Sequence, residues 1–177
     1  VGLVGLAITA IFIPAISSAD AWIYGGASGL AGAIGIGLLY GSLAIGPMSI
    51  LSPATAFISA IVPVSVGISQ GEGGGLGFFI ALALALIAVI LVGFVPETGA
   101  VRPQPIGLLM AAGSGTFIGL TIVLIDASPG DSGLIPLLAN RIVSSPALLI
   151  AAAFVVLYRS ARQRSPRLPG LSELMPV

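Results

Sequence analysis

The chain has 177 residues, of which 57% are hydrophobic and 7% are charged, whereas an ordinary soluble domain has about 25% charged residues. The formal net charge is zero, which gives no basis for nucleic-acid binding. The sequence contains no cysteine or histidine, which excludes disulfides, thiolate chemistry, histidine metal sites and histidine base catalysis. The composition predicts an all-α protein, a polytopic bundle of transmembrane helices.

Six apolar segments follow one another along the chain, separated by short polar breaks. They cover residues 1–16, 22–44, 48–70, 76–95, 106–125 and 133–158. A helix that crosses a bilayer needs ~20 residues, so the sequence predicts about six spans. The first segment is short and begins inside an apolar run, and we interpret this start as a cut within a transmembrane helix. Trp22 and Tyr24 open the second segment, where interfacial aromatic residues are common.

Glycines punctuate two of the segments at helical spacing. In the second segment they lie three and four residues apart, as at Gly25, Gly29 and Gly32, and the fifth segment contains the pair Gly115 and Gly119. Small residues at this spacing let helix backbones approach closely within a membrane. We therefore expect these glycines to mediate packing rather than ligand binding.

The third segment is the one around which we expect the other helices to pack. It is uncharged and contains Pro53 and Pro63, which we predict to break the helix and free backbone carbonyls. Broken helices of this kind often line a pathway through the bilayer. The hydroxyls of Ser52, Thr55 and Ser59 recur along the same segment. They either bond back to carbonyls of their own helix or form a stripe that faces a pore.

The sixth segment contains the residue that is most unusual for a membrane helix. Arg141 lies well inside it, where a charge costs about 2.5–3.5 kcal/mol on insertion scales, and such residues usually face a cavity or a partner. The functional interpretation is a cavity cation that attracts anionic or zwitterionic solutes, and the structural one is a side chain that snorkels to the interface. Asn140 is its neighbour, about 100° around the helix. Pro146, further along, is predicted to break this helix.

The polar breaks carry no recognisable chemistry. The linker 71–77 is rich in glycine but is followed by no lysine, so it is not a phosphate loop. Glu72 is either a proton-coupling carboxylate or a solvated helix end, and Asp126 and Asp131 flank a Pro-Gly turn. With the aspartates in breaks and histidine absent, an intramembrane enzyme is not expected, and neither is a metal or cofactor.

A run of motifs in the first half of the sequence resembles a known family. The motifs are a "Y-x-x-L-A-x-G-P" turn, an early proline, a "P-V" pair and a terminal "G-E", here Tyr40, Leu43, Gly46, Pro47, Pro53, Pro63, Val64, Gly71 and Glu72. Together with Arg141 in the later half, they resemble EamA-type transporters of the drug/metabolite transporter superfamily. That family has ten helices in two inverted five-helix repeats.

The resemblance implies an internal repeat in this chain. Residues 1–95 would be the end of the first repeat, 96–105 the loop between repeats, 106–158 the start of the second repeat, and 159–177 a basic tail. The first helix and the last three would be missing, so we expect this chain alone not to transport.

The function implied is secondary transport of small organic solutes such as amino acids or metabolites. We expect export by alternating access in the bacterial inner membrane. The expected partners are membrane lipid, the solute, and the missing helices or a second copy. Substrate contacts are expected from Arg141, Tyr40, Ser52, Thr55, Ser59 and Asn140. The alternative is a non-transporting scaffold or partner subunit, and the two differ in whether Arg141 lies in a wet cleft or at a helix interface.

Overall fold

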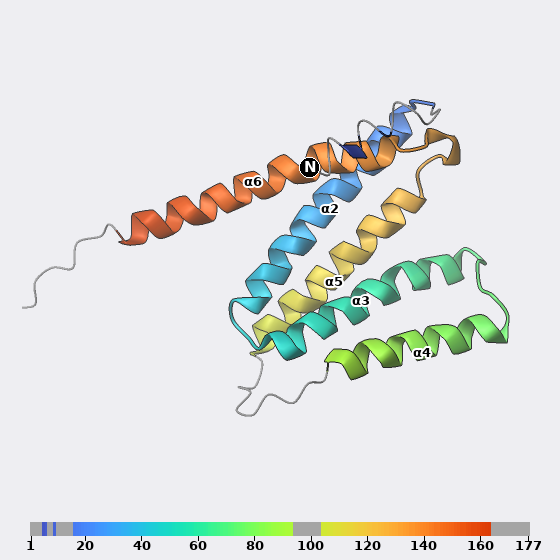
Figure 1. The fold of residues 1–177 in the computed structure, drawn as a ribbon, viewed down its shortest axis with the longest axis horizontal. Helices are drawn as coiled ribbons and strands as arrows, with labels where there is room; N and C mark the ends of the chain where they lie inside the picture. Colours follow the sequence, from blue (N-terminus) through green and yellow to red (C-terminus); the bar gives the residue numbers. More distant parts are fainter. Residues whose placement is uncertain (1–4, 7–8, 10–15, 94–103, 164–177) are drawn as a thin grey trace, which may run out of the picture.

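Figure 1 shows the computed structural model, which describes residues 5–6, 9, 16–93 and 104–163. The elements are α2 (Ala19–Leu43), α3 (Met48–Ser69), α4 (Leu76–Gly93), α5 (Pro105–Asp126), the short 3-10 helix η1 (Gly130–Ser132) and α6 (Ile135–Gln163). Every element within the described ranges is helical, which confirms the predicted all-α class.

Four helices are long and apolar enough to cross a membrane. They are α2, α3, α5 and α6, while α4 is a shorter apolar helix. Their length and composition indicate a membrane protein. Most of the predicted first segment and of the loop 96–105 lies outside the described residues, so the total of six spans, the division into repeats and the ten-helix arrangement stay predictions.

Two helix boundaries differ from those expected. α2 begins at Ala19 rather than at residue 22, because the hydroxyl of Ser18 accepts a hydrogen bond from the N–H of Ala21 at 3.2 Å and caps the helix. α6 extends to Gln163, so the helix continues into the first five residues of the region 159–177 that the sequence predicts as a basic tail. No proline or glycine stands between 159 and 163 to end the helix.

Prolines inside α3 and α6 do not interrupt these helices. α3 is continuous through Pro53 and Pro63, and α6 through Pro146, so the prediction of helix-breaking residues is wrong. Each proline removes one N–H···O bond, and apolar surroundings offer no water to open the neighbouring bonds. At Pro63 the carbonyl without a donor is that of Ser59, and Gly119 packs on it so closely that a Cβ would lie 3.0 Å from its oxygen.

The centre of the bundle is α2 with α5, not α3 as expected from the sequence. α2 packs extensively against α5 and α6, α5 also packs against α3, and α4 rests on α3. Figure 1 shows α5 between α2 and α3, with α4 at the outer edge. The reason is that small residues line α2 and α5, which lets each of them contact two neighbours closely.

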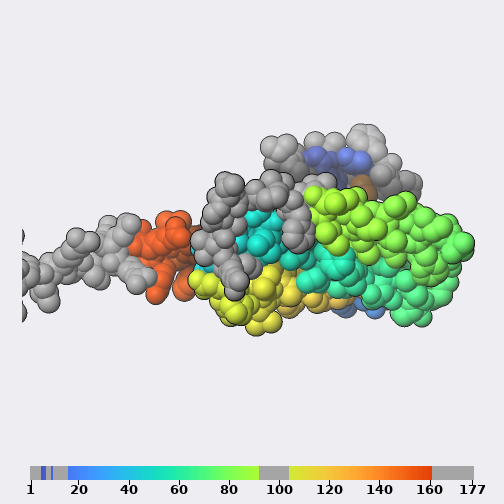
Figure 2. Space-filling model, turned by 90° about the horizontal axis from the view of Figure 1, so that it is seen from below, coloured from blue at the N-terminus to red at the C-terminus, as the bar shows by residue number. Residues whose placement is uncertain are grey.

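The interior of the bundle is made of small side chains. The buried residues include Ala21, Ala31, Ser28 and Ser114, and Leu51 is the largest fully buried side chain. Large aliphatic side chains point outward instead, above all from α4 and from the end of α6, which projects beyond the rest of the described molecule (Figure 2). Tight small-residue contacts with an aliphatic exterior are the arrangement that a lipid environment favours.

Candidate functional site

Two glycines of α2 let α6 approach it at backbone distance. A Cβ at Gly25 would lie 2.5 Å from the carbonyl oxygen of Pro136, and a Cβ at Gly29 would lie 2.5 Å from that of Asn140. Any larger side chain at either position would push the helices apart, which confirms that these glycines mediate packing. The contact places the first turns of α6, and with them Arg141, beside the first half of α2.

Hydroxyl groups join α5 to α2. Ser114 Oγ donates to the carbonyl oxygen of Gly35 at 2.7 Å, and Thr121 Oγ1 lies 3.2 Å from the carbonyl oxygen of Ser28 and 3.0 Å from that of Phe117 in its own helix. Such interhelical bonds stabilise membrane proteins by about 0.6 kcal/mol each on average. They hold Thr121 on the part of α5 that faces both α2 and α6.

Asn140 connects α6 to α2. Its Nδ2 donates to Ser28 Oγ at 2.8 Å, and this hydroxyl donates in turn to the carbonyl oxygen of Gly25 at 2.7 Å. The next residue, Arg141, is about 100° further around the helix. The amide that was predicted to bind substrate is therefore used in part to fix α6, and the contact directs Arg141 toward α5.

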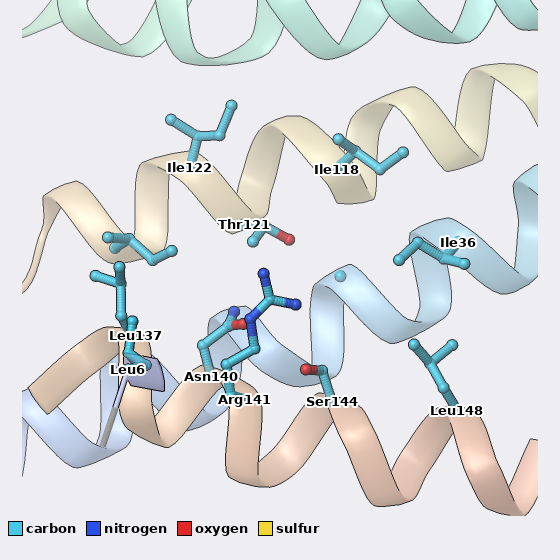
Figure 3. Close-up of a pocket in the computed structure, with 12 residues that line it drawn as sticks. Leu6, Ile36, Ile118, Thr121, Ile122, Leu137, Asn140, Arg141, Ser144 and Leu148 are labelled. Carbon is cyan, nitrogen blue, oxygen red and sulfur yellow. The ribbon is translucent and has the colours of Figure 1, made fainter. Parts of the chain in front are cut away.

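An open cavity of about 410 Å³ lies between α2, α5 and α6, with Leu6 also at its edge, and Arg141, whose side chain is exposed, is on its wall. Within the described residues, α5 and α6 each pack on α2 but not to any comparable extent on each other, so a groove stays open between them. Figure 3 shows the guanidinium of Arg141 reaching from α6 toward Thr121 on α5, with Ser144 beside it on the same helix. The remaining wall is mostly isoleucine and leucine.

The described wall of the cavity carries a positive charge. Among the described residues that line it, Arg141 is charged and none is acidic. Arg141 lies six positions after Ile135, the first residue of α6, about 9 Å along the axis at 1.5 Å per residue. A guanidinium presents N–H groups in a planar fork that binds carboxylate or phosphate through two parallel hydrogen bonds. The cavity is thus suited to an oxyanion.

Two of the predicted hydroxyls on α3 have structural partners instead. Thr55 is buried, and its Oγ1 lies 3.0 Å from the carbonyl oxygen of Leu51 and 3.2 Å from that of Ala111 on α5. Ser59 Oγ donates to the carbonyl oxygen of Ala56 at 2.9 Å. Thr55 therefore joins α3 to α5, and Ser59 bonds to its own helix, as the simpler of the two interpretations predicted.

The structure does not bring the predicted α3 residues and Tyr40 to the Arg141 cavity. Ser52 is half-buried on α3, and Tyr40 is 69% exposed near the end of α2. Neither of them, nor Thr55 nor Ser59, lines the cavity. Of the six expected contact residues, Arg141 and Asn140 are together at this site. Thr55 of the predicted stripe faces α5 rather than a pore, because Gly115 lets α5 pack closely on its backbone.

Two polar residues of the cavity wall, Ser144 and Thr121, were not found from the sequence. Ser144 lies three residues after Arg141, and residues at this spacing share a helix face, so a search along α6 would have found it. Thr121 carries no such signal, because its place in the cavity depends on how α5 packs against α2.

The described acidic residues form no metal site. No three histidine, cysteine, aspartate or glutamate residues converge within the described part of the chain. Glu72 and Asp126, with Gln70, line a smaller cavity of about 210 Å³ at the ends of α3 and α5. Both carboxylates are exposed. Buried side-chain nitrogen and oxygen atoms in the described residues all have hydrogen-bond partners.

No family model matches the chain, and neither does any curated protein or solved structure. The resemblance to EamA-type transporters therefore rests on the sequence motifs alone. The observations that bear on function are therefore the cavity and the four span-length helices, three of which line it.

Proposed function

We propose that the protein is part of a secondary transporter, EamA-like, that exports small organic solutes across the bacterial inner membrane. The observation that carries the proposal is the position of Arg141 in a cavity between three span-length helices. An ionisable side chain inside a membrane segment is costly and commonly marks a solute or ion pathway. A volume of about 410 Å³ lies within the range of small-molecule sites, ~300–1,000 Å³.

The packing around the cavity also supports transport. α6 contacts α2 through the smooth surface at Gly25 and Gly29, and it packs on no other described helix to a comparable extent. A helix held along one line of contact can rock about that line, which would widen or narrow the groove toward α5. Alternating access in transporters is largely such rocking of packed elements around a fixed site.

The position of Arg141 weighs against the scaffold alternative. A scaffold would use an intramembrane arginine in a helix–helix contact, paired with a carboxylate or with backbone carbonyls. Here the α2–α6 contact is made by Gly25, Gly29 and Asn140, while the guanidinium extends into the cavity (Figure 3).

The test is solute flux through the complete protein, because the resemblance implies helices beyond this chain. The protein is reconstituted in liposomes, and the efflux of labelled amino acids and organic acids is compared with that of empty vesicles. We expect flux above leak that falls at least tenfold in Arg141→Gln. Arg159→Gln removes an arginine near the far end of the same helix that does not line the cavity; it is the matched control and should retain the flux. Absence of any flux above leak would contradict transport.

A further inference from the structure

The charge in the cavity distinguishes between solute classes. Arg141 supplies a positive charge, and no acidic residue is among the described residues that line the cavity. An α-amino acid carries an ammonium group next to its carboxylate. In this cavity the ammonium would have neutral hydroxyls and amides for partners and would lie within a few ångströms of the guanidinium, where like charges repel.

The rest of the cavity is suited to a hydrocarbon tail. On the α5 side, Ile118, Ile122 and Ile125 flank Thr121, and on the α6 side Leu137 and Leu148 flank the polar residues along the helix. In Figure 3 the guanidinium lies between α5, with Ile118 and Ile122, and α6, with Thr121 and Ser144 nearby. Pockets of this kind, mostly apolar with few polar groups, fix the orientation of a ligand through the polar groups.

We infer that the cavity binds a monocarboxylate with a branched apolar tail, in preference to the amino acid of the same skeleton. The carboxylate sits on the fork of Arg141, on the same helix face as the hydroxyl of Ser144, and the tail lies along the isoleucines of α5, while the Thr121 hydroxyl keeps its bonds to backbone carbonyls. This inference rests on the proposed function for its physiological meaning, since it names the class of solute that the transporter carries.

Binding to the purified protein in neutral detergent tests the inference. Three probes share one skeleton: 4-methylpentanoate carries a negative charge, leucine adds the ammonium group, and 4-methylpentanamide has no charge. We expect isothermal titration to show binding of the acid, with leucine and the amide at least tenfold weaker. Leucine binding as tightly as the acid would overturn the inference, and so would equal binding of the amide.

Variants of Arg141 assign the binding to this cavity. Arg141→Gln should weaken binding of 4-methylpentanoate at least tenfold, and Arg141→Lys, which keeps the charge but loses the fork, should weaken it less. Arg159→Gln should leave it unchanged. Thermal unfolding of each variant shows whether it is folded. If Arg141→Gln does not fold, Arg141→Lys is used for the binding test in its place. Unchanged binding in a folded Arg141 variant would overturn the inference.

A lipid phosphate is the competing source of an oxyanion. Native mass spectrometry of the protein with phosphatidylglycerol, with and without 4-methylpentanoate, separates the two. We expect the acid to bind whether or not the lipid is retained. Retention of the lipid that depends on Arg141, together with no binding of the acid, would overturn the inference of a free solute.

Binding and flux are measured separately, so the ligand class and the transport function can each fail without the other. Binding of the acid without flux in liposomes would contradict the proposed function and leave the ligand class standing. Flux of leucine that exceeds flux of 4-methylpentanoate would leave transport standing and overturn the ligand class.

Discussion

The α2–α6 and α3–α5 crossings are both formed through a pair of glycines, but they differ in what lies beside them. In each, two glycines four residues apart meet the backbone of a helix that contains proline: Gly25 and Gly29 face α6, while Gly115 and Gly119 face α3. The α3–α5 crossing is closed by small and apolar groups. Beside the α2–α6 crossing lies the cavity with Arg141.

Thr55 illustrates how the first of these crossings is closed. Its hydroxyl lies within 3.2 Å of the carbonyl oxygen of Ala111, and Leu51 one turn earlier is fully buried. A glycine pair therefore brings two helices together without by itself forming a ligand-binding site. The groove that the neighbouring helices leave open, and the charge placed in it, distinguish the α2–α6 crossing.

The largest effect is expected for Gly29→Ala. The new Cβ would lie 2.5 Å from the carbonyl oxygen of Asn140 and 3.0 Å from its Cα, and backbone atoms cannot rotate away. We expect α6 to be displaced, with a loss of about 1–3 kcal/mol of stability, as for other overpacked cores, and loss of 4-methylpentanoate binding. Thermal unfolding in detergent and isothermal titration measure the two effects.

Gly37→Ala is the matched control for this variant. It lies on the same helix, and a Cβ there would meet nothing within 4 Å. Replacing glycine by alanine within a helix stabilises it by roughly 0.5–1 kcal/mol, so the control should unfold no earlier than the parent. Equal behaviour of the two variants would show that the close α2–α6 contact does not exist.

The helices themselves were largely predictable from the sequence. α3 was expected over residues 48–70 and is observed over Met48–Ser69, because a long uncharged run between Pro47 and Gly71 leaves few alternatives. The prolines misled the prediction, because each was expected to interrupt its helix, whereas each removes one N–H···O bond only. Within apolar surroundings the bonds on either side persist.

The arrangement of the site could be predicted only in part. The cost of placing Arg141 in a membrane singles it out without any structure, and Asn140 and Ser144 follow from their positions on the same helix. Thr121 and Thr55 both lie in apolar helices, and the sequence around each does not indicate which of them faces a cavity. One faces the cavity and the other a closed crossing, because helix pairing decides which face is covered.

A smaller effect, confined to stability, is expected for Gly115→Ala. Its Cβ would meet one backbone atom, the carbonyl oxygen of Thr55 at 2.7 Å, and Cβ of Ile58 at 2.8 Å, whereas a Cβ at Gly29 would meet three backbone atoms, the nearest at 2.5 Å. We expect a loss of about 1–2 kcal/mol, the lower part of the range for overpacking, with 4-methylpentanoate still bound. Gly113→Ala, where the nearest atom is the flexible end of Leu38 at 3.3 Å, is the control.

The Gly115→Ala variant tests whether the ligand site depends on the α3–α5 crossing. Retained binding in a destabilised protein would place the ligand site at α2, α5 and α6 alone. Loss of binding equal to that in Gly29→Ala would contradict the separation of the two crossings.

The smallest effect is expected for single hydrogen bonds. Asn140→Ala removes the amide that donates to Ser28 Oγ. Thr55→Val removes the hydroxyl that is shared between the carbonyl oxygens of Leu51 and Ala111. We expect each to cost about 0.6 kcal/mol, and no more than about 1.7 kcal/mol. A double-mutant cycle of Ser28→Ala with Asn140→Ala should give a coupling of the same size, measured by unfolding in detergent. Zero coupling would show that this bond does not hold α6.

The central claim is that solute reaches the face of α5 opposite Arg141, and thiol labelling tests it directly. The chain contains no cysteine, so a single introduced thiol reports without background. Thr121→Cys lies on the cavity wall, and Ser114→Cys lies two turns earlier on α5 at a fully buried position. In membranes, a negatively charged methanethiosulfonate reagent should modify the first rapidly, with protection by 4-methylpentanoate, and the second hardly at all. Equal labelling of the two positions, or none at residue 121, would contradict the account.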